Sequence, residues 1–500
     1  MNAAGGPAET LEGRTSNSLI IHCGDGFYYN RREVRRSRAR LQCRHFKKGC
    51  PGTASLSLET GWLHHLQPHN HAPDRLFTDD SALRRAMLHE AKTNVHGIKV
   101  QSILNDFKVR CPDVQLASRF TTVRMKSQLY RARSSNYPRI PSSLIYLGIL
   151  LGLPDMRPLC KTVDGADYIF QGVVGSAGDK TIALIFASGR MLQFLQSRDN
   201  LHSDGTFRKR SKKPAMAQIF NIVTKYGENI IAIARVLMLT RTTQAYIAVI
   251  EQIRTLAPNM NPVRIHCDFE RAEMNAWRAM FPRSRVVGCL WHYAVACSCF
   301  AHSLGMRDLA LENELVFDLI RCLCGVPMLP SHMIWLGVLE IWDEVQQTPW
   351  SNNFRPLFEY FEKEWKPRVD ELSVFNAPER TNNSSESDNH MLAKVLPQNR
   401  PNCFHLIGGF VKLEHLSWCD KVAVDAGRQV TGLRKWKTVH NEAVVQRATN
   451  LLVTNQITLA HFLHMSSYAI HAAVMQGLKV RRPINDSESE QSESDNSDSE

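Results

Sequence analysis

The sequence has no long apolar run and no apolar start. Nowhere do eighteen uncharged apolar residues follow one another, which argues against a membrane-spanning helix. The stretch from Met1 to Pro7 does not have the pattern of a secretory signal peptide. We therefore expect an intracellular protein with reduced thiols. Its 13 cysteines, an odd and scattered set, should serve as metal ligands or core residues.

Acidic residues are scarce outside the end of the chain. The formal net charge is +13, yet residues 486–500 hold seven acids and no base. The rest of the chain has 61 basic and 41 acidic residues, and this excess of positive charge suits a polyanionic partner. A length of 500 residues predicts two or three domains, and a content of 43% hydrophobic residues is typical of a folded protein.

The first third of the chain predicts two small modules. Residues 1–16 are polar, and we expect them to be flexible. Residues 17–75 contain short apolar runs separated by turn residues such as Gly24 and Gly52, which favours a β-rich module. From about 80 to 145 the pattern is helical and basic and ends in a proline-containing connector. This predicts a helical DNA-binding or linker region.

Strands and helices alternate between about residues 165 and 290. A hairpin around 225–229 is followed by helix, strand, helix and strand, which predicts an α/β domain with a mixed sheet. From 289 to about 475 nearly every segment is helical. Residues 485–500 are rich in Ser, Asp and Glu and cannot bury apolar surface, so we expect a disordered acidic tail.

Two cysteines and two histidines in the β-rich module have the chemistry of metal ligands. Six residues separate Cys43 from Cys50, and eighteen more precede the pair His69 and His71. Two thiolates and two imidazoles form the tetrahedral shell of a structural zinc ion, and so small a module has little core to stabilise it. The alternative is two core cysteines and two surface histidines that bind nothing.

Basic residues crowd the predicted strands around the first cysteine, close to the aromatic run Phe27 to Tyr29. Such a surface suits contact with DNA phosphates, and a solvated basic face is the alternative. The predicted DNA contacts in this module are Arg31, Arg32, Arg35, Arg36, Arg38 and Arg40.

The same module resembles a known family. Its aromatic run, its two cysteines and the segment from His69 to Asp74 are similar to a FLYWCH-type zinc finger. The resemblance implies a zinc finger over residues 17–75 with DNA as its partner. It implies that the zinc ligands are Cys43, Cys50, His69 and His71.

Two aspartates follow predicted strands farther along the chain. Asp204 ends an extended segment, and Asp268 follows the apolar run 263–267 and precedes a helix. Acids at strand ends can converge, and phosphodiester cleavage needs carboxylates that hold two divalent ions. The alternative for Asp268 is a helix N-cap. Basic residues after Asp204 are further predicted DNA contacts, namely Arg208, Lys209 and Arg210.

A third acid, Glu386, follows Arg380-Thr381-Asn382-Asn383, where Thr381 or Asn382 can cap a helix. With Asp204-Gly205-Thr206-Phe207 and the run from Asp268 to Ala272, this block resembles the Mutator-like element (MULE) transposase family. The resemblance implies an RNase H-like domain over 165–420, interrupted by an all-helical insertion at about 295–375. The helical pattern itself predicts C-terminal helices over 421–480. It implies catalytic and Mg²⁺-binding or Mn²⁺-binding roles for Asp204, Asp268 and Glu386.

Cys289 and His292 form a Cys-x-x-His step after the last predicted strand, which the same family also has. We regard them as candidate metal ligands. The alternative is a core cysteine beside a packed histidine.

These features together predict a nuclear DNA transposase of the DDE type, which carries three catalytic acids. It would bind the terminal repeats of its element as a homo-oligomer, cut them and transfer the strands to target DNA. A zinc ion would stabilise the finger, and Mg²⁺ or Mn²⁺ would serve catalysis. The main alternative is a domesticated, non-catalytic nuclear DNA-binding protein derived from a transposase. An RNase H-type hydrolase acting on RNA is a third.

Overall fold

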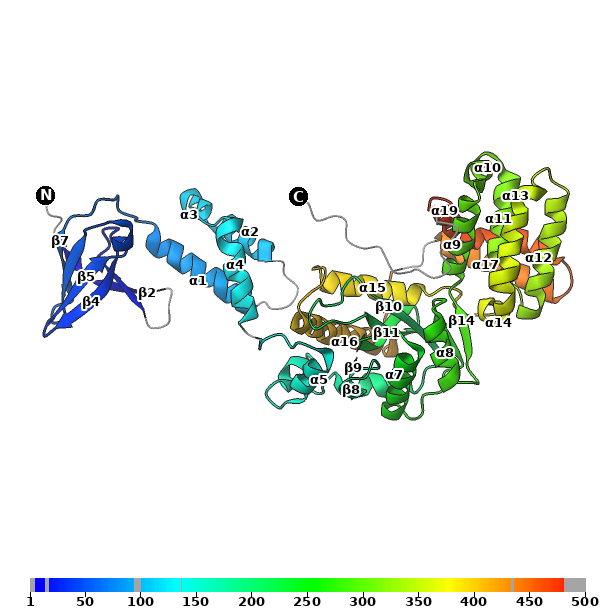
Figure 1. Ribbon diagram of the computed structural model, residues 1–500, viewed down its shortest axis with the longest axis horizontal. Helices are drawn as coiled ribbons and strands as arrows, with labels where there is room; N and C mark the ends of the chain where they lie inside the picture. The colour runs from blue at the N-terminus through cyan, green and yellow to red at the C-terminus, as the bar shows by residue number, and fades with distance from the viewer. Residues whose placement is uncertain (1–4, 14–17, 94–99, 136, 433–435, 481–500) are drawn as a thin grey trace. The chain divides into compact units, whose positions relative to one another are not determined.

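The chain divides into two compact units, Met1–Pro138 and Arg139–Glu500. No helix among the described residues combines the length and the apolar character needed to cross a bilayer. The expected acidic tail at 485–500 lies outside the described residues. The computed structural model describes residues 5–13, 18–93, 100–135, 137–432 and 436–480 (Figure 1).

The first unit begins with a seven-stranded antiparallel sheet in the order β1-β7-β6-β5-β4-β3-β2 (Figure 1). Side chains alternate along β5, where Ala39, Leu41 and Cys43 are buried, because successive residues of a strand face opposite sides. The strands are β1 (Gly6–Pro7), β2 (Glu9–Glu12), β3 (Leu19–His22), β4 (Tyr29–Arg35), β5 (Arg38–Cys43), β6 (Thr53–Ser57) and β7 (Trp62–Gln67).

Part of the segment expected to be flexible is structured. β2 pairs with β3 from Glu9 opposite His22 to Glu12 opposite Leu19, and β1 pairs with β7. The expectation for residues 1–16 is therefore corrected over 5–13, where the edges of the sheet supply backbone hydrogen-bond partners for a polar segment. Residues 1–4 and 14–16 lie outside the described part of the chain.

Four helices complete this unit around a small apolar core that includes Met87, Leu104, Phe120 and Leu129. The side chain of Asp113 caps one helix and that of Thr121 caps the next. The helices are α1 (Phe77–Thr93), α2 (Val100–Arg110), α3 (Val114–Ser118) and α4 (Thr122–Ser134).

The second unit contains the mixed sheet that the sequence predicts, in the order β14-β13-β10-β11-β12-β9-β8. β10, β13 and β14 are parallel, and the pairs β10–β11, β11–β12, β12–β9 and β9–β8 are antiparallel. This confirms the α/β class. The strands are β8 (Phe170–Val174), β9 (Ala183–Phe186), β10 (Asn200–Thr206), β11 (Gln218–Tyr226), β12 (Asn229–Met238), β13 (Arg264–Cys267) and β14 (Arg285–Gly288).

Helices cover both faces of this sheet (Figure 1). α6 (Gly189–Leu195), α7 (Thr243–Leu256) and α8 (Arg271–Met280) share one apolar core with the strands. α15 (Asn383–Val395) and α16 (Cys403–Asp425) pack on the strands from the other side. Within β10, Ser203 bonds to α8 while the next residue, Asp204, bonds to α15. The alternation of the strand therefore directs Asp204 toward α15.

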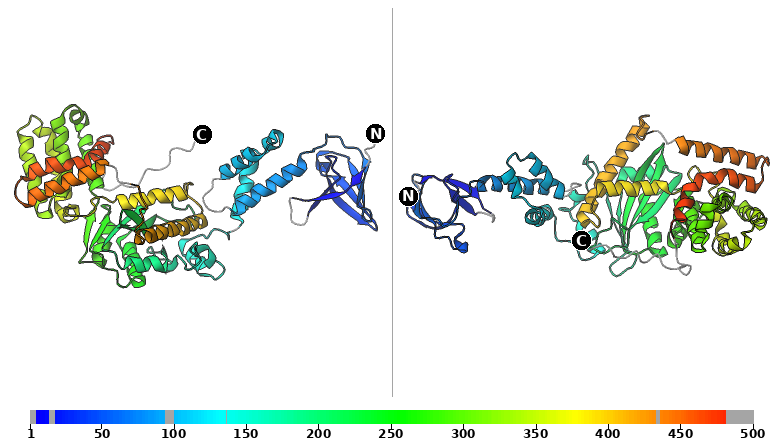
Figure 2. Two further views of the ribbon diagram at one scale, coloured as in Figure 1. Left: turned by 180° about the vertical axis from the view of Figure 1, so that it is seen from behind. Right: turned by 90° about the horizontal axis from the view of Figure 1, so that it is seen from above.

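The helical insertion and the C-terminal helices form one structure. Residues between Leu290 and Val374 share a single apolar core with residues between Val445 and Leu478 (Figures 1 and 2). The expected boundary at 420 falls inside α16. The remaining helices are α5 (Leu144–Gly152), α9 (Leu290–Ser303), α10 (Met306–Glu312), α11 (Glu314–Gly325), α12 (Ser331–Gln346), α13 (Ser351–Tyr360), α14 (Val369–Leu372), α17 (Trp436–Val453), α18 (Leu459–Ser466) and α19 (His471–Gly477).

Candidate active site and metal centre

Asp204 lies near the end of β10, on the face that α15 covers. Asn389 of α15 donates from Nδ2 to Asp204 Oδ2 at 2.7 Å. Burial, together with the negative charge of Asp268, raises the pKa of Asp204 to about 7. The two aspartates are thus close enough to repel each other.

Asp268 follows β13, which runs parallel to β10 with His266 opposite His202. Both strands therefore deliver an aspartate two residues beyond this pair, at the same edge of the sheet. Asp268 is not the cap of α8, since the N-cap position is Glu270, so the alternative we considered for it is wrong. Its Oδ1 lies 2.9 Å from His292 Nδ1.

Glu386 lies in the first turn of α15. Its side chain is half exposed, and its Oε1 is 4.0 Å from Nε2 of His292. Of the two predicted caps, Thr381 and Asn382, it is Asn382 that occupies the N-cap position of α15. Its side chain makes no capping hydrogen bond. Instead its Nδ2 donates to Ser203 O at 3.0 Å and to Asp268 Oδ1 at 3.3 Å.

Helical spacing explains how α15 reaches both aspartates. Asn382 precedes Glu386 by four residues, and Asn389 follows it by three. Residues three and four apart lie on one face of a helix. The N-cap residue Asn382 therefore contacts Asp268, and Asn389 of α15 itself contacts Asp204. The sequence analysis missed both asparagines as site residues, although the Asn382-Asn383 pair belongs to the block that carries the family resemblance.

Cys289 and His292 lie at the N-terminus of α9, beside Asp268. The donor atoms of these three residues lie within 4.8 Å of one another, so they could hold a metal ion. Burial opposes a charge on His292, but hydrogen bonds to Asp268 and Cys289 outweigh it and raise the pKa of His292 to about 11. Cys289 is buried, and its Sγ accepts a hydrogen bond from the backbone N–H of Asn382 at 3.2 Å.

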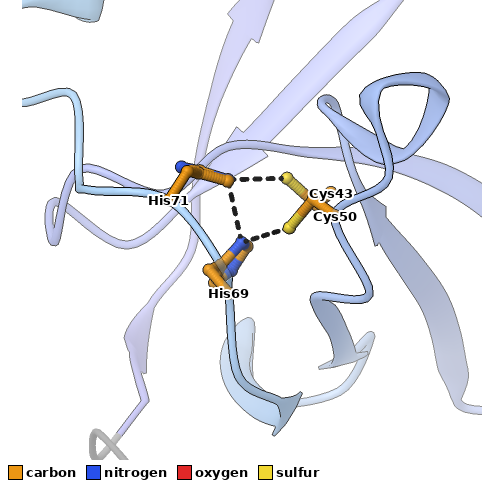
Figure 3. Close-up of side chains that lie close together, drawn as sticks. All are labelled: Cys43, Cys50, His69 and His71. Atoms are coloured by element: carbon orange, nitrogen blue, oxygen red, sulfur yellow. Dashed lines mark hydrogen bonds between the residues drawn. The ribbon is translucent and has the colours of Figure 1, made fainter.

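The four expected zinc ligands converge beside the end of β5, the central strand of the first sheet (Figure 3). Sγ of Cys43 is 3.3 Å from Nε2 of His71, and Sγ of Cys50 is 3.4 Å from Nδ1 of His69. The two facing nitrogens, His69 Nδ1 and His71 Nε2, are 3.2 Å apart. Four soft and borderline donors this close fit the ligand shell of a zinc ion. Both cysteines are buried, which keeps the group away from bulk water.

The basic residues predicted to contact DNA divide into two groups. All six arginines of the β4–β5 hairpin are exposed. In the loop after β10, Arg208 is exposed, but Lys209 is buried and its Nζ lies 3.2 Å from both Gln398 O and Asn399 Oδ1. Arg210 donates to Ala217 O at 2.8 Å. The charged groups of Lys209 and Arg210 thus bind the protein itself, and their contact with DNA stays a prediction.

The stretch that supplies β10 to β14 and the start of α9 has a recognisable counterpart. Residues 200–295 match the MULE transposase domain. The match supports the MULE family, and its range contains Asp204, Asp268, Cys289 and His292. Glu386 and the zinc-ligand group lie outside the matched range of the MULE transposase domain. A search of the curated proteins gave no match.

Proposed function

We propose that this protein is a DNA transposase of the DDE type, with an RNase H-like catalytic domain. The observation that supports this is the contact of α15 and its N-cap residue with both aspartates. Asn382 binds Asp268, Asn389 binds Asp204, and Glu386 lies between the two asparagines on the helix. Five antiparallel strands, β8, β9, β12, β11 and β10, are extended by the parallel strands β13 and β14, and this sheet with the acids at the strand ends also supports the proposed fold.

The residues of the proposed site fit a pair of hard divalent cations. Carboxylate oxygens are the ligands that Mg²⁺ and Mn²⁺ prefer, and repulsion between Asp204 and Asp268 is relieved by positive charge. Asp204, Asp268 and Glu386 would hold the ions, and the two asparagines would orient the aspartates. The bound ions would activate water or a 3′-hydroxyl and stabilise the leaving oxygen.

The first unit would then supply DNA recognition. We propose a FLYWCH-type zinc finger in which Cys43, Cys50, His69 and His71 bind structural zinc, and a DNA-binding surface on the arginine-rich hairpin. Nuclear location, terminal repeats and target DNA as partners, and a homo-oligomeric assembly complete the proposal.

One observation favours the second candidate, a domesticated DNA-binding protein without catalysis. His292 lies 2.9 Å from Asp268 and 4.0 Å from Glu386, and Asp268 and Cys289 raise its pKa, which favours the charged imidazolium that can neutralise these acids. The two candidates differ in whether DNA is cut.

The test is cleavage of a supercoiled plasmid that carries candidate terminal repeats, in Mg²⁺, Mn²⁺ or Ca²⁺. We expect nicking by the wild type with Mg²⁺ or Mn²⁺, and its loss in Glu386→Gln. Ser387→Ala, at the exposed neighbouring position, is the matched control and should remain active. Tight binding of the same plasmid without any nicking by the wild type would support the second candidate instead.

A further inference from the structure

A chain of four polar side chains leads away from the zinc-ligand group into the first sheet. The hydroxyl of Tyr29 lies 2.7 Å from Nε2 of His69 and 2.6 Å from Nδ1 of His65. Nε2 of His65 lies 2.8 Å from Oδ2 of Asp25. Tyr29 is completely buried, so no water competes for its hydroxyl.

The direction of each hydrogen bond in this chain follows from its last member. Oδ2 of Asp25 accepts no hydrogen bond from the described residues, but its negative charge lies 2.8 Å from Nε2 of His65 and favours a proton on that nitrogen, which leaves Nδ1 as an acceptor. Tyr29 must then donate its proton to His65 Nδ1, and its oxygen accepts from Nε2–H of His69. His69 is thereby held as the tautomer whose Nδ1 carries the free lone pair. That nitrogen is the one that faces Cys50 and His71.

The second histidine of the group is held by a different partner and through the opposite nitrogen. Nδ1 of His71 lies 2.9 Å from the backbone oxygen of Ala72, which only accepts, so its Nε2 presents the lone pair toward Cys43. The ring of His69 is also held in plane, because Phe27 stacks on it with centroids 4.0 Å apart and planes 7° apart. Each imidazole thus presents one nitrogen with a free lone pair toward the group, as a metal ligand requires.

We propose that Asp25, His65 and Tyr29 are positioning residues that hold His69 in its Nδ1-ligating tautomer and orientation. This inference rests on the proposed zinc site. We call the chain of His69, Tyr29, His65 and Asp25 the relay. Tyr29 comes from β4 and His65 from β7, so the relay also links metal binding to the pairing of the sheet.

A competing arrangement uses some of the same atoms. Cys23, Asp25 and His65 have donor atoms within 4.8 Å of one another and could hold a second metal ion. In that case His65 would be a ligand, and the full chain would bind two ions in this unit. The relay predicts one ion, with His65 hydrogen-bonded to Tyr29 and ion-paired with Asp25.

The experiment compares two neighbouring tyrosines in the full-length chain. Tyr28 is also buried, but its hydroxyl lies 3.1 Å from Oγ1 of Thr78 and bonds to neither histidine of the relay. Zn²⁺ affinity is measured by competition with a chelating dye, and the visible spectrum is recorded after loading with Co²⁺. We expect Tyr29→Phe and His65→Gln to weaken Zn²⁺ binding by about 10- to 100-fold, and Tyr28→Phe to change it less than about 2-fold.

The Co²⁺ bands separate positioning from simple destabilisation. They should shift in Tyr29→Phe and stay unchanged in Tyr28→Phe, because only the first variant frees the orientation of a ligand. Equal affinity and spectra in the two variants would overturn the relay while leaving the zinc site intact. Two ions per chain, one of them lost in Cys23→Ser, would also overturn it. If the wild type binds no Zn²⁺, or if Cys43→Ser binds Zn²⁺ as tightly as the wild type does, both the proposed zinc site and the relay are wrong.

Discussion

Asn382 Nδ2 lies 3.3 Å from Asp268 Oδ1, and this contact joins two motifs that are 114 residues apart in the chain. The same amide nitrogen donates to the backbone oxygen of Ser203, beside Asp204. One buried asparagine therefore touches the end of β10, the residue that follows β13 and the start of α15. The relative positions of the three acids depend on it.

Replacing Asn382 should disturb the acids and the fold around them. Asn382→Ala leaves the Ser203 oxygen without its donor, and we expect a loss of about 1–3 kcal/mol in the free energy of unfolding. If the proposed cleavage occurs, it should fall by at least tenfold. Urea unfolding and the plasmid assay measure the two effects. Asn383→Ala, at the exposed neighbouring position, is the control, and an equal effect there would contradict the assignment.

The ion pair between Arg235 of β12 and Asp388 of α15 should stabilise the packing of α15 on the sheet. Both residues are buried, so Asp388→Asn leaves an uncompensated guanidinium charge inside the protein. We expect a cost of about 3–5 kcal/mol, measured by urea unfolding. Asp308→Asn breaks an exposed pair with Arg307 and should cost about 0–1 kcal/mol. Similar losses in the two variants would contradict this role.

Glu273 should make stability depend on pH. It is fully buried beneath the site, and burial raises its pKa well above the ordinary value. The folded protein then keeps a proton that the unfolded chain releases above about pH 4.3, so Glu273 costs stability as pH rises. Glu273→Gln removes this cost.

The melting temperature of Glu273→Gln relative to the wild type should therefore increase from pH 5 to pH 8. The control is Glu312→Gln at an exposed position, which should show no such trend. A difference that stays flat or shrinks toward pH 8 would show that Glu273 is ionised in the folded protein.

Removal of zinc should unfold the first sheet selectively. The module has a small apolar core, with Ile21, Leu41 and Leu63 among its buried residues. Chelation by EDTA should make residues 18–75 sensitive to limited proteolysis, and Cys43→Ser should behave in the same way without chelator. Cys419→Ser, which changes an exposed cysteine in the second unit, is the control. Resistance of the metal-free module to protease would argue against a structural ion.

The arginine hairpin should govern the salt dependence of DNA binding. Each phosphate contact that is lost lowers the slope of log K against log salt by about 0.9. Replacing exposed Arg31, Arg35 and Arg38 together with Gln should reduce the slope by about 3. Arg307→Gln, an exposed change in α10, should leave it unchanged. Filter binding at several salt concentrations measures the slope, and an unaltered slope in the triple variant would place the DNA surface elsewhere.

The sequence by itself determined the α/β class and the order of strands and helices between residues 200 and 288, but not helix α6 before them. Those elements are set by local patterns: apolar strands, turn residues at 225–229 and amphipathic helices. It also indicated that Cys43, Cys50, His69 and His71 would lie together, because thiols and imidazoles with no disulfide role have few other uses. The prediction of a flexible segment was wrong over residues 5–13, where strands form. A polar strand at a sheet edge has no apolar pattern that would reveal it.

Only the tertiary structure decided which polar side chains touch. Lys209 looks like a surface residue in a basic run, but the fold buries it against the segment at 398–399. Asn382 looks like a helix cap, but it binds Asp268 and Ser203. The relay from His69 to Asp25 joins β4, β7 and two loops. Contacts between distant segments depend on how faces pack together, and hydrogen-bond geometry is sensitive to a few tenths of an ångström, which no local pattern encodes.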